Sequence, residues 1–260
     1  MKTLTVVKIG GNVIDNPKAL ESFVDDFSRL PSPKILVHGG GKLATRLCER
    51  LDIPVQMIEG RRVTDKETLD VATMVYAGLV NKKLVAKLQQ RGCNAIGLSG
   101  ADLCLLPAVK RSSVPVDYGY VGDIITDNVN TGALCSLLDM GAVPVFCALS
   151  YDGNGTLLNS NADGVASALA VAMSARQEVD LVYCFELPGV MRDISDSESW
   201  IPEINEDSYA RLREEGIVQK GMIPKIDNAF AALRQGVRCV VIKSSADIAA
   251  KRGTIIRIHE

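Results

Sequence analysis

Histidine is nearly absent from this chain of 260 residues, in which only His38 and His259 occur. Two histidines are too few for a zinc site built from imidazoles, and no Cys-x-x-Cys pair offers thiolate ligands instead. We therefore expect no metal site made by the protein itself. If the chain is an enzyme, its chemistry does not rest on histidine, and we expect His38 to have a structural role.

Long apolar runs and basic blocks are also missing. No apolar stretch reaches the roughly 18–20 residues that a membrane-spanning helix needs, and the N-terminus lacks the pattern of a signal peptide. The net charge is −2 and aromatic residues make up 5%, which argues against a nucleic-acid surface of basic stripes and stacking rings. The seven cysteines are odd in number and stand mostly in apolar runs, which is typical of reduced, buried thiols. We expect a cytoplasmic protein that binds neither membranes nor nucleic acids.

Two types of segment alternate along the chain, short runs rich in β-branched residues and longer amphipathic stretches. The apolar spacing predicts strands at residues 4–9, 35–37, 95–98, 143–149, 179–183, 238–242 and 254–258. It predicts helices at residues 19–30, 43–51, 131–140, 161–173, 205–214 and 225–235. A capping-box pattern, Thr64 three residues before Glu67, opens a long helix to about residue 90, and DGNG at residues 152–155 predicts a hairpin turn. The alternation predicts an α/β fold, a three-layer sandwich with helices on both faces of a central, mainly parallel open sheet.

Two glycine clusters follow predicted strands, KIGG at residues 8–11 and HGGG at residues 38–41. Ligands bind at the carboxyl ends of parallel strands, where glycines let backbone N–H groups approach an anion closely. The first cluster alone fits a phosphate site and a simple turn with a solvated lysine about equally well. The second favours function, because three consecutive glycines are costly in backbone entropy. A lipase-like oxyanion loop is disfavoured, since no G-x-S-x-G nucleophile motif is present.

Four further positions carry polar or charged side chains that are candidates for binding or catalysis. One arginine of the Arg61-Arg62 pair could clamp a carboxylate, although two solvated arginines are as plausible on this evidence alone. Asn161 is a predicted helix N-cap and Asp163 gains from the helix dipole, whereas Asn159 lacks such a structural explanation. Lys225 follows Pro224 in the first turn of a helix, where a cation is unfavourable unless an anion is bound nearby.

The sequence combines two lysines, two glycine clusters and an aspartate, and it offers no catalytic histidine. This combination favours phosphoryl transfer, in which catalysis comes mainly from positioning and charge stabilisation. The motifs KIGG, HGGG, RRVT, YVGD, NSNAD and GMIPK follow one another in this order and resemble the N-acetylglutamate kinases of the amino-acid kinase family. The lysine–glycine motif and the aspartate resemble aspartate, glutamate, carbamate and uridylate kinases as well. The combination of HGGG, RRVT, N-x-N-A-D and GMIPK is more specific to the acetylglutamate branch.

The resemblance implies the amino-acid kinase fold and a reaction in which the γ-carboxylate of an N-acylated glutamate attacks the γ-phosphate of ATP. It implies that residues 1–173 form a lobe for the acylated amino acid and the dimer contact, and that residues 174–260 form an ATP lobe on the same sheet. By the same resemblance, Lys8 and Lys225 stabilise the transferring phosphoryl group and Asp163 orients them. It also implies that the acylated amino acid is held by Gly40, Gly41, Arg62 and Asn159, and that the phosphate path is lined by Gly10, Gly11 and Gly39. We expect Mg²⁺ to arrive with ATP, held mainly by phosphate oxygens and water.

The chain departs from the family pattern at three places, one of which is the stretch near residues 97–106, which keeps the family's outline but differs locally. Phe185-Glu186 stands where the family commonly has Thr or Ser followed by Asp, and Lys220 stands where a glycine or another small residue is usual. Resemblance further implies a homodimer. Because Lys8 lies close to the start of the chain, we expect no additional N-terminal helix of the kind that links arginine-inhibited members into hexamers, and hence no inhibition by arginine.

Other functions remain open at this point. The acceptor could be another N-acyl-glutamate, such as N-succinyl-L-glutamate, whose extra carboxylate would need a cation such as Lys110 or Arg111. It could also be another amino-acid carboxylate, such as glutamate itself. An alternative of a different class is an amino-acid sensor without catalytic activity, although binding alone would not require both Lys8 and Lys225.

Overall fold

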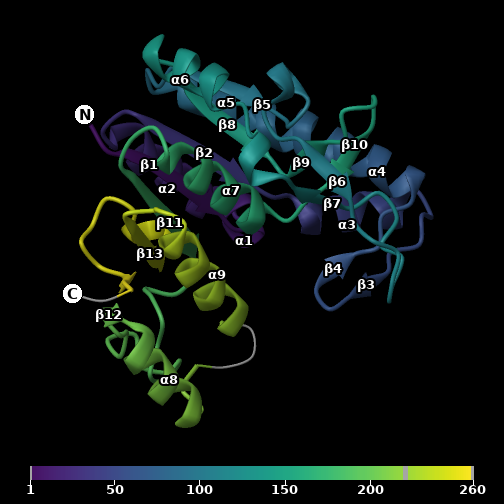
Figure 1. The fold of residues 1–260 in the computed structure, drawn as a ribbon. Coiled ribbons are helices and arrows are strands. Elements are labelled where there is room, and N and C mark those ends of the chain that lie inside the picture. The colour runs from purple at the N-terminus through teal and green to yellow at the C-terminus, as the bar shows by residue number, and fades with distance from the viewer. Residues whose placement is uncertain (1, 219–221, 259–260) are drawn as a thin grey trace.

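The computed structural model of the chain describes residues 2–218 and 222–258, and it contains one large sheet with helices on both sides (Figure 1). Eight strands follow the spatial order β12-β14-β13-β11-β1-β2-β8-β5. They are β1 (Leu4–Ile9), β2 (Lys34–His38), β5 (Ala95–Leu98), β8 (Val143–Cys147), β11 (Val179–Phe185), β12 (Glu203–Ile204), β13 (Cys239–Ser244) and β14 (Thr254–Ile256). Neighbouring strands are parallel except β13 and β14, which are antiparallel. The predicted α/β fold with a mainly parallel open sheet is confirmed.

The two faces of the sheet carry separate cores because strand residues alternate in direction. On one face, Leu4 and Val6 of β1 belong to the core that also contains side chains from α6 (Thr131–Asp139), α7 (Ala162–Ser174), α8 (Glu206–Glu214) and α9 (Ile223–Arg234). On the other, Val7 and Ile9 join side chains from α1 (Gly11–Asp15), α2 (Pro17–Arg29), α3 (Gly41–Arg50), α4 (Lys66–Thr73) and α5 (Asn81–Gln90). Lys8 therefore points to the α7 side and His38 to the α5 side.

Helix starts follow ordinary capping chemistry. The Asn16 side chain accepts hydrogen bonds from the N–H groups of Lys18 and Ala19, so α2 begins at Pro17, two residues earlier than the apolar spacing predicted. Asn161 caps α7 by accepting from the Asp163 N–H at 2.8 Å, which confirms the predicted N-cap.

The long helix after residue 64 differs from its prediction in two respects. Its N-cap is Asp65, which accepts from the Thr68 N–H at 2.8 Å, so the predicted Thr64 capping box is wrong. Thr64 is engaged elsewhere, because its N–H donates to Tyr118 and its hydroxyl donates to the Arg62 carbonyl at 3.0 Å. The helix reaches Gln90 as predicted, but its middle, η1 (Met74–Val80), is a π-helix.

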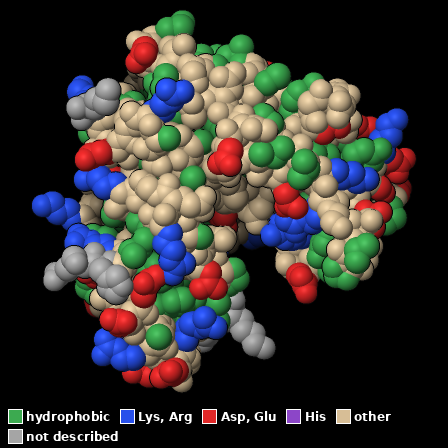
Figure 2. All heavy atoms as spheres, viewed as in Figure 1, with side chains coloured by type: hydrophobic (Ala, Val, Ile, Leu, Met, Phe, Trp, Pro, Cys, Tyr) green, Lys and Arg blue, Asp and Glu red, His purple; other side chains and the backbone are tan. Residues whose placement is uncertain are grey.

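Small antiparallel pairs and short turns surround the carboxyl ends of the N-terminal strands. The pairs are β3 (Met57–Ile58) with β4 (Arg61–Arg62), β6 (Ala108–Lys110) with β7 (Gly122–Ile124), and β9 (Leu149–Tyr151) with β10 (Leu157–Asn159). The last pair encloses the predicted turn at residues 152–155. Short 3₁₀ turns lie at Asp102–Cys104, Thr126–Asn128 and Ser245–Asp247. Figure 2 shows the surface hollowed between the part that carries α8 and α9 and the part that carries β3 and β4.

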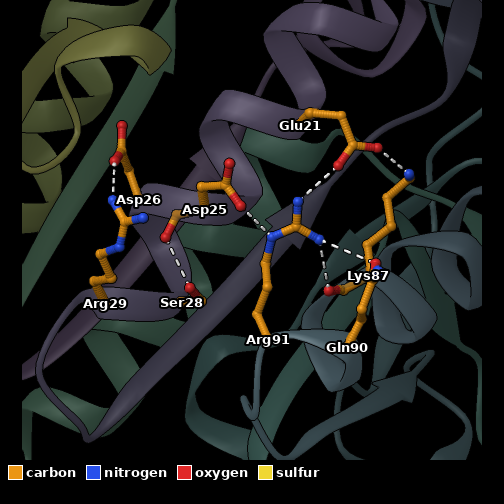
Figure 3. Close-up of polar contacts among 8 residues, drawn as sticks. All are labelled: Glu21, Asp25, Asp26, Ser28, Arg29, Lys87, Gln90 and Arg91. Atoms are coloured by element: carbon orange, nitrogen blue, oxygen red, sulfur yellow. Dashed lines mark hydrogen bonds and ion pairs between the residues drawn. The ribbon is translucent and has the colours of Figure 1, made fainter.

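Ion pairs join α2 to α5 at the back of the sheet (Figure 3). Arg91, just after α5, donates to Glu21 at 2.7 Å and also to Asp25, and Lys87 contacts Glu21. These contacts join the C-terminal end of α5 to α2. Across the described residues, no helix is both long and apolar enough to pass through a bilayer.

Candidate active site

Two cavities meet at the HGGG loop, at the carboxyl ends of β1 and β2. The first, here called the arginine cavity, has a volume of about 200 Å³ and is lined by side chains that include Arg62, Tyr76 and Asn159. The second, the lysine cavity, has a volume of about 460 Å³ and is lined by Lys8 and Lys225 among others. Both share Ala162 and the predicted glycines of the loop, namely Gly39, Gly40 and Gly41. Gly10 and Gly11 line the lysine cavity alone.

Lys8, which lines the lysine cavity, forms an ion pair with the partly buried Asp163. Lys8 belongs to the face of β1 that packs against α7, and Asp163 lies in the first turn of that helix. The Lys8 Nζ lies 2.7 Å from the Asp163 Oδ1. The two predicted residues, 155 positions apart in sequence, are thus brought into contact.

Lys225 reaches the same cavity from the first turn of α9. Its Nζ lies 3.7 Å from the centroid of the Phe185 ring. Burial lowers the pKa of Lys225, Asp163 opposes that shift, and the nearby positive charge of Lys8 adds to it. Two ammonium groups and the backbone N–H groups of glycine loops form a site that can bind a polyanion such as a phosphate chain. Lys220 and Gly221, which precede this helix, lie outside the described residues, as does His259.

The HGGG loop is fixed by His38. The ring is fully buried, its Nε2 accepts from the Asn81 Nδ2 at 3.0 Å, and its Nδ1 donates to the Gly39 carbonyl at 2.7 Å. Asn81 Nδ2 also donates to the Val145 carbonyl at 2.8 Å, which ties the loop to β8. Burial lowers the pKa of His38 to about 4, so the imidazole is neutral at pH 7. The structural role predicted for His38 is confirmed.

Arg62 is the buried cation of the arginine cavity. Its Nη2 donates to the Gly41 carbonyl at 2.9 Å and to the Thr45 Oγ1 at 2.7 Å. Its Nη1 is buried with no partner in hydrogen-bond geometry among the described residues. Asn159, in β10, donates from Nδ2 to the Thr64 Oγ1 at 3.0 Å and is 8% exposed. A guanidinium with a free nitrogen beside an amide suits a carboxylate ligand.

Tyr76 is a lining residue of the arginine cavity that the sequence did not single out. A Cβ atom on Gly40 would lie 2.7 Å from the Tyr76 Cδ1, so this ring rests directly on the glycine loop. Burial raises the pKa of the Tyr76 hydroxyl, and Arg62 opposes that shift. The apolar spacing predicted only that residue 76 lies on a helix, and a π-helical turn cannot be read from that pattern. Lys42 and Asn12, in contact with each other at the rim of the lysine cavity, were missed as well.

The two cations considered for a longer acyl group do not line the arginine cavity. Lys110 lies over the Tyr120 ring, with its Nζ 5.2 Å from the centroid. Arg111 is paired with Asp123, with its Nε 3.1 Å from Oδ2, and lines a separate polar cavity next to the first.

Comparisons with known proteins agree with this geometry. The chain matches the amino acid kinase family over residues 3–244. An acetylglutamate kinase from Cytophaga hutchinsonii is 54% identical over 243 residues, which cover 93% of this chain and 91% of that protein. An acetylglutamate kinase from Methanopyrus kandleri is 44% identical and covers 98% of this chain and 100% of its own. The solved structure of smu.665 from Streptococcus mutans has a TM-score of 0.81 at 28% identity and covers 100% of both chains. The chain therefore belongs to the amino acid kinase family and, within it, to the acetylglutamate kinases.

Proposed function

We propose that this protein transfers the γ-phosphoryl group of ATP to the γ-carboxylate of N-acetyl-L-glutamate, as a step of arginine biosynthesis. The observation that carries the proposal is the pair of adjoining cavities, one with a free arginine nitrogen and one with two lysines, separated only by a loop of glycines. Such an arrangement holds a carboxylate substrate and a phosphate chain end to end. The names of the relatives support the choice of acceptor.

In this proposal, Lys8 and Lys225 stabilise the negative charge on the phosphoryl group as it moves. Asp163 orients Lys8 through their 2.7 Å contact and limits the repulsion between the two ammonium groups. The glycines Gly10, Gly11 and Gly39 line the path of the phosphates and offer backbone N–H groups without side chains in the way. Preorganised charge of this kind acts most strongly where charge develops in the transition state.

The arginine cavity holds the acceptor. The free Nη1 of Arg62 and the amide of Asn159 bind the acylated amino acid, and the backbone of Gly40 and Gly41 allows its close approach to the phosphate side. The attacking oxygen forms a bond to the γ-phosphorus while the bond to the leaving ADP oxygen breaks. The acceptor carboxylate, with a pKa of about 4.3, is ionised at pH 7, so no general base is needed.

The chemistry of the residues fits a magnesium ion that is bound through the nucleotide. No group of three or more His, Cys, Asp or Glu side chains is arranged to hold a metal among residues 2–218 and 222–258. Asp163 is already paired with Lys8, and Glu186 is the other carboxylate at the lysine cavity. We therefore propose that phosphate oxygens and water supply most of the ligands of Mg²⁺, which shields the phosphate charge when bound.

The lobes, the subunits and the compartment complete the proposal. The described lining of the arginine cavity comes from residues before 174, whereas the lysine cavity is also lined by Phe185, Glu186 and Lys225. This division supports an amino-acid lobe of residues 1–173 and an ATP lobe of residues 174–260. Met74 and Leu79 of η1 are 54% and 44% exposed, which supports a homodimer that buries this helix. Cys104 is a free, exposed thiol, which suits the reducing cytoplasm. Light scattering with and without arginine tests the dimer, and a hexamer or strong arginine inhibition would contradict it.

An ADP-release assay across a panel of acceptors tests the proposed reaction. We expect the highest kcat/KM with N-acetyl-L-glutamate and far lower values with L-glutamate and L-aspartate. N-Succinyl-L-glutamate should be a poor acceptor, because Arg62 already binds the amino acid in this proposal and neither Lys110 nor Arg111 lines the arginine cavity to pair with the extra carboxylate. Burying a carboxylate without a partner costs several kcal/mol. A clear excess for the succinyl substrate would overturn the choice of acyl group. Binding without turnover of any acceptor would overturn the proposed kinase activity.

A further inference from the structure

Phe185 faces both lysines of the lysine cavity. It ends β11, and its part-buried ring lies with its centroid 3.7 Å from the Lys225 Nζ and 5.1 Å from the Lys8 Nζ. The ring is supported from behind, because Tyr183 points to the same side of the strand and stacks on it with centroids 6.4 Å apart and planes inclined by 20°. One aromatic ring is therefore in contact range of two ammonium groups.

The two ammonium groups repel each other, and the nearby carboxylates of Asp163 and Glu186 favour the charged form of Lys225 without forming an ion pair with it in the described part of the chain. Asp163 contacts Lys8 at 2.7 Å, whereas Lys225 has no ion pair within 4 Å in the described part of the chain. Lys225 also lies in the first turn of α9, a helix of 12 residues, where the helix dipole repels a cation. Its ammonium group lies in contact with the Phe185 ring, which attracts a cation through the ring quadrupole.

A ring suits this position better than a second carboxylate would. A carboxylate at contact distance would hold Lys225 firmly, but it would also repel an incoming polyanion and compete with it for the ammonium group. An aromatic face attracts the ammonium group without adding net negative charge to the cavity. The lysine is thus held in place and remains available to a phosphate oxygen.

We propose that Phe185 is a positioning residue, whose ring holds Lys225, and more weakly Lys8, in the lysine cavity before the nucleotide binds. This inference rests on the proposed phosphoryl transfer and assigns to Phe185 a role in it that acts through Lys225. The expected consequence is that the loss of the ring impairs the chemical step more than the binding of the acceptor.

The first test needs no turnover. In protein carrying lysine labelled with ¹³C at Cε, the Lys225 signal should be shifted upfield by the ring current of Phe185, and Lys225→Arg identifies that signal by removing it. Phe185→Leu should return the signal to the position of solvent-exposed lysines, and Phe185→Tyr should keep it shifted. An unshifted Lys225 signal in the unmodified protein would overturn the inference, even if the kinase activity is confirmed.

The second test separates kcat from KM. Phe185→Leu should lower kcat about tenfold and change the acceptor KM by less than about twofold, whereas Phe185→Tyr should restore kcat to within about twofold. Without the ring the ammonium form of Lys225 is less favoured, so the basic limb of the kcat profile should move to lower pH. Asp163, Lys8 and Glu186 are the other charges that act on Lys225, and they are unchanged in these variants.

Phe27 offers a matched control. Its ring lies 5.1 Å from the buried Lys34 Nζ on the other side of the sheet, away from both cavities. Phe27→Leu should lower the melting temperature and leave kcat unchanged. Unchanged kcat in Phe185→Leu, or equal losses in Phe185→Leu and Phe185→Tyr, would contradict the inference. Absence of ADP release from the unmodified protein would instead contradict the proposed function, and the spectroscopic test would still decide the role of the ring.

Discussion

The contact between Gly40 and Tyr76 offers a sharp test of how the glycine loop shapes the acceptor site. An added Cβ on residue 40 would lie 2.7 Å and 3.1 Å from two carbons of the Tyr76 ring and 3.6 Å from Val75 Cγ1. Real Cβ contacts essentially never fall below 3.0 Å, and the ring is only 5% exposed, so it cannot swing freely into solvent. Gly40→Ala must therefore displace either the loop or the ring.

Overpacking of this kind typically costs about 1–3 kcal/mol. Since both movable parts line the arginine cavity, we expect most of that free energy to be lost from substrate binding, and kcat/KM for N-acetyl-L-glutamate to fall about 10- to 100-fold. Tyr76→Leu removes the atoms that clash. In the double variant Gly40→Ala/Tyr76→Leu, the loss should be clearly smaller than the sum of the two single losses.

Steady-state kinetics on the four proteins of this cycle give the coupling directly. Gly164→Ala in α7 is the matched control, because an added Cβ there meets nothing within 4 Å. We expect it to change kcat/KM by less than about twofold and to leave stability equal or slightly higher. Gly40→Ala with normal kcat/KM, or a double variant no better than additive, would refute the steric reasoning.

Three further predictions concern charged and titratable side chains. Lys8→Ala and Lys225→Ala should each lower kcat about 10²–10³-fold and affect the acceptor KM much less, because a preorganised charge matters most in the transition state. A change in KM alone would show that the roles assigned to the two lysines are wrong. Arg62→Ala should raise the acceptor KM about 10- to 100-fold, since it removes charged hydrogen bonds of about 1.5–3 kcal/mol, and Arg29→Ala on the surface of α2 serves as its control. The pKa of His38 is about 4 in the folded chain and about 6.5 in the unfolded chain. Between about pH 6.5 and pH 4, the imidazole of His38 therefore binds a proton in the unfolded chain but not in the folded one. The free energy of unfolding should fall by about 3 kcal/mol as the pH drops through this range. Urea unfolding of the unmodified protein and of His38→Gln measures that contribution, and equal pH slopes for both would contradict it.

The strand–helix alternation was sufficient to predict the sheet, because its central strands are buried on both faces and read as continuous apolar runs. The short edge strand β12 was not predicted, since two residues paired with β14 leave no periodic signal. The helix start at Asp65 was missed for another reason. Thr64 is drawn into contacts with Arg62, Tyr118 and Asn159, and these long-range partners are invisible in a local capping pattern.

The site was predicted at the level of motifs. Lys8, the HGGG loop, Asp163 and Lys225 all lie at strand ends or helix starts, and parallel strands bring such positions to one edge. The sequence did not reveal that the loop separates two cavities, because that depends on Tyr76 and the π-helical turn that carries it. Nor did it reveal that the unfavourable position of Lys225 is balanced by the ring of Phe185, a residue noticed only as a departure from the family pattern.

Trapping of the acyl phosphate product shows whether the acceptor carboxylate itself receives the phosphoryl group. The protein would be incubated with MgATP, N-acetyl-L-glutamate and hydroxylamine, which converts an acyl phosphate into a stable hydroxamate. We expect hydroxamate and ADP in equal amounts, in a reaction that is abolished by omission of the acceptor and strongly reduced in Lys8→Ala. ADP release without hydroxamate would contradict it, because ATP would then be hydrolysed without transfer to the acceptor.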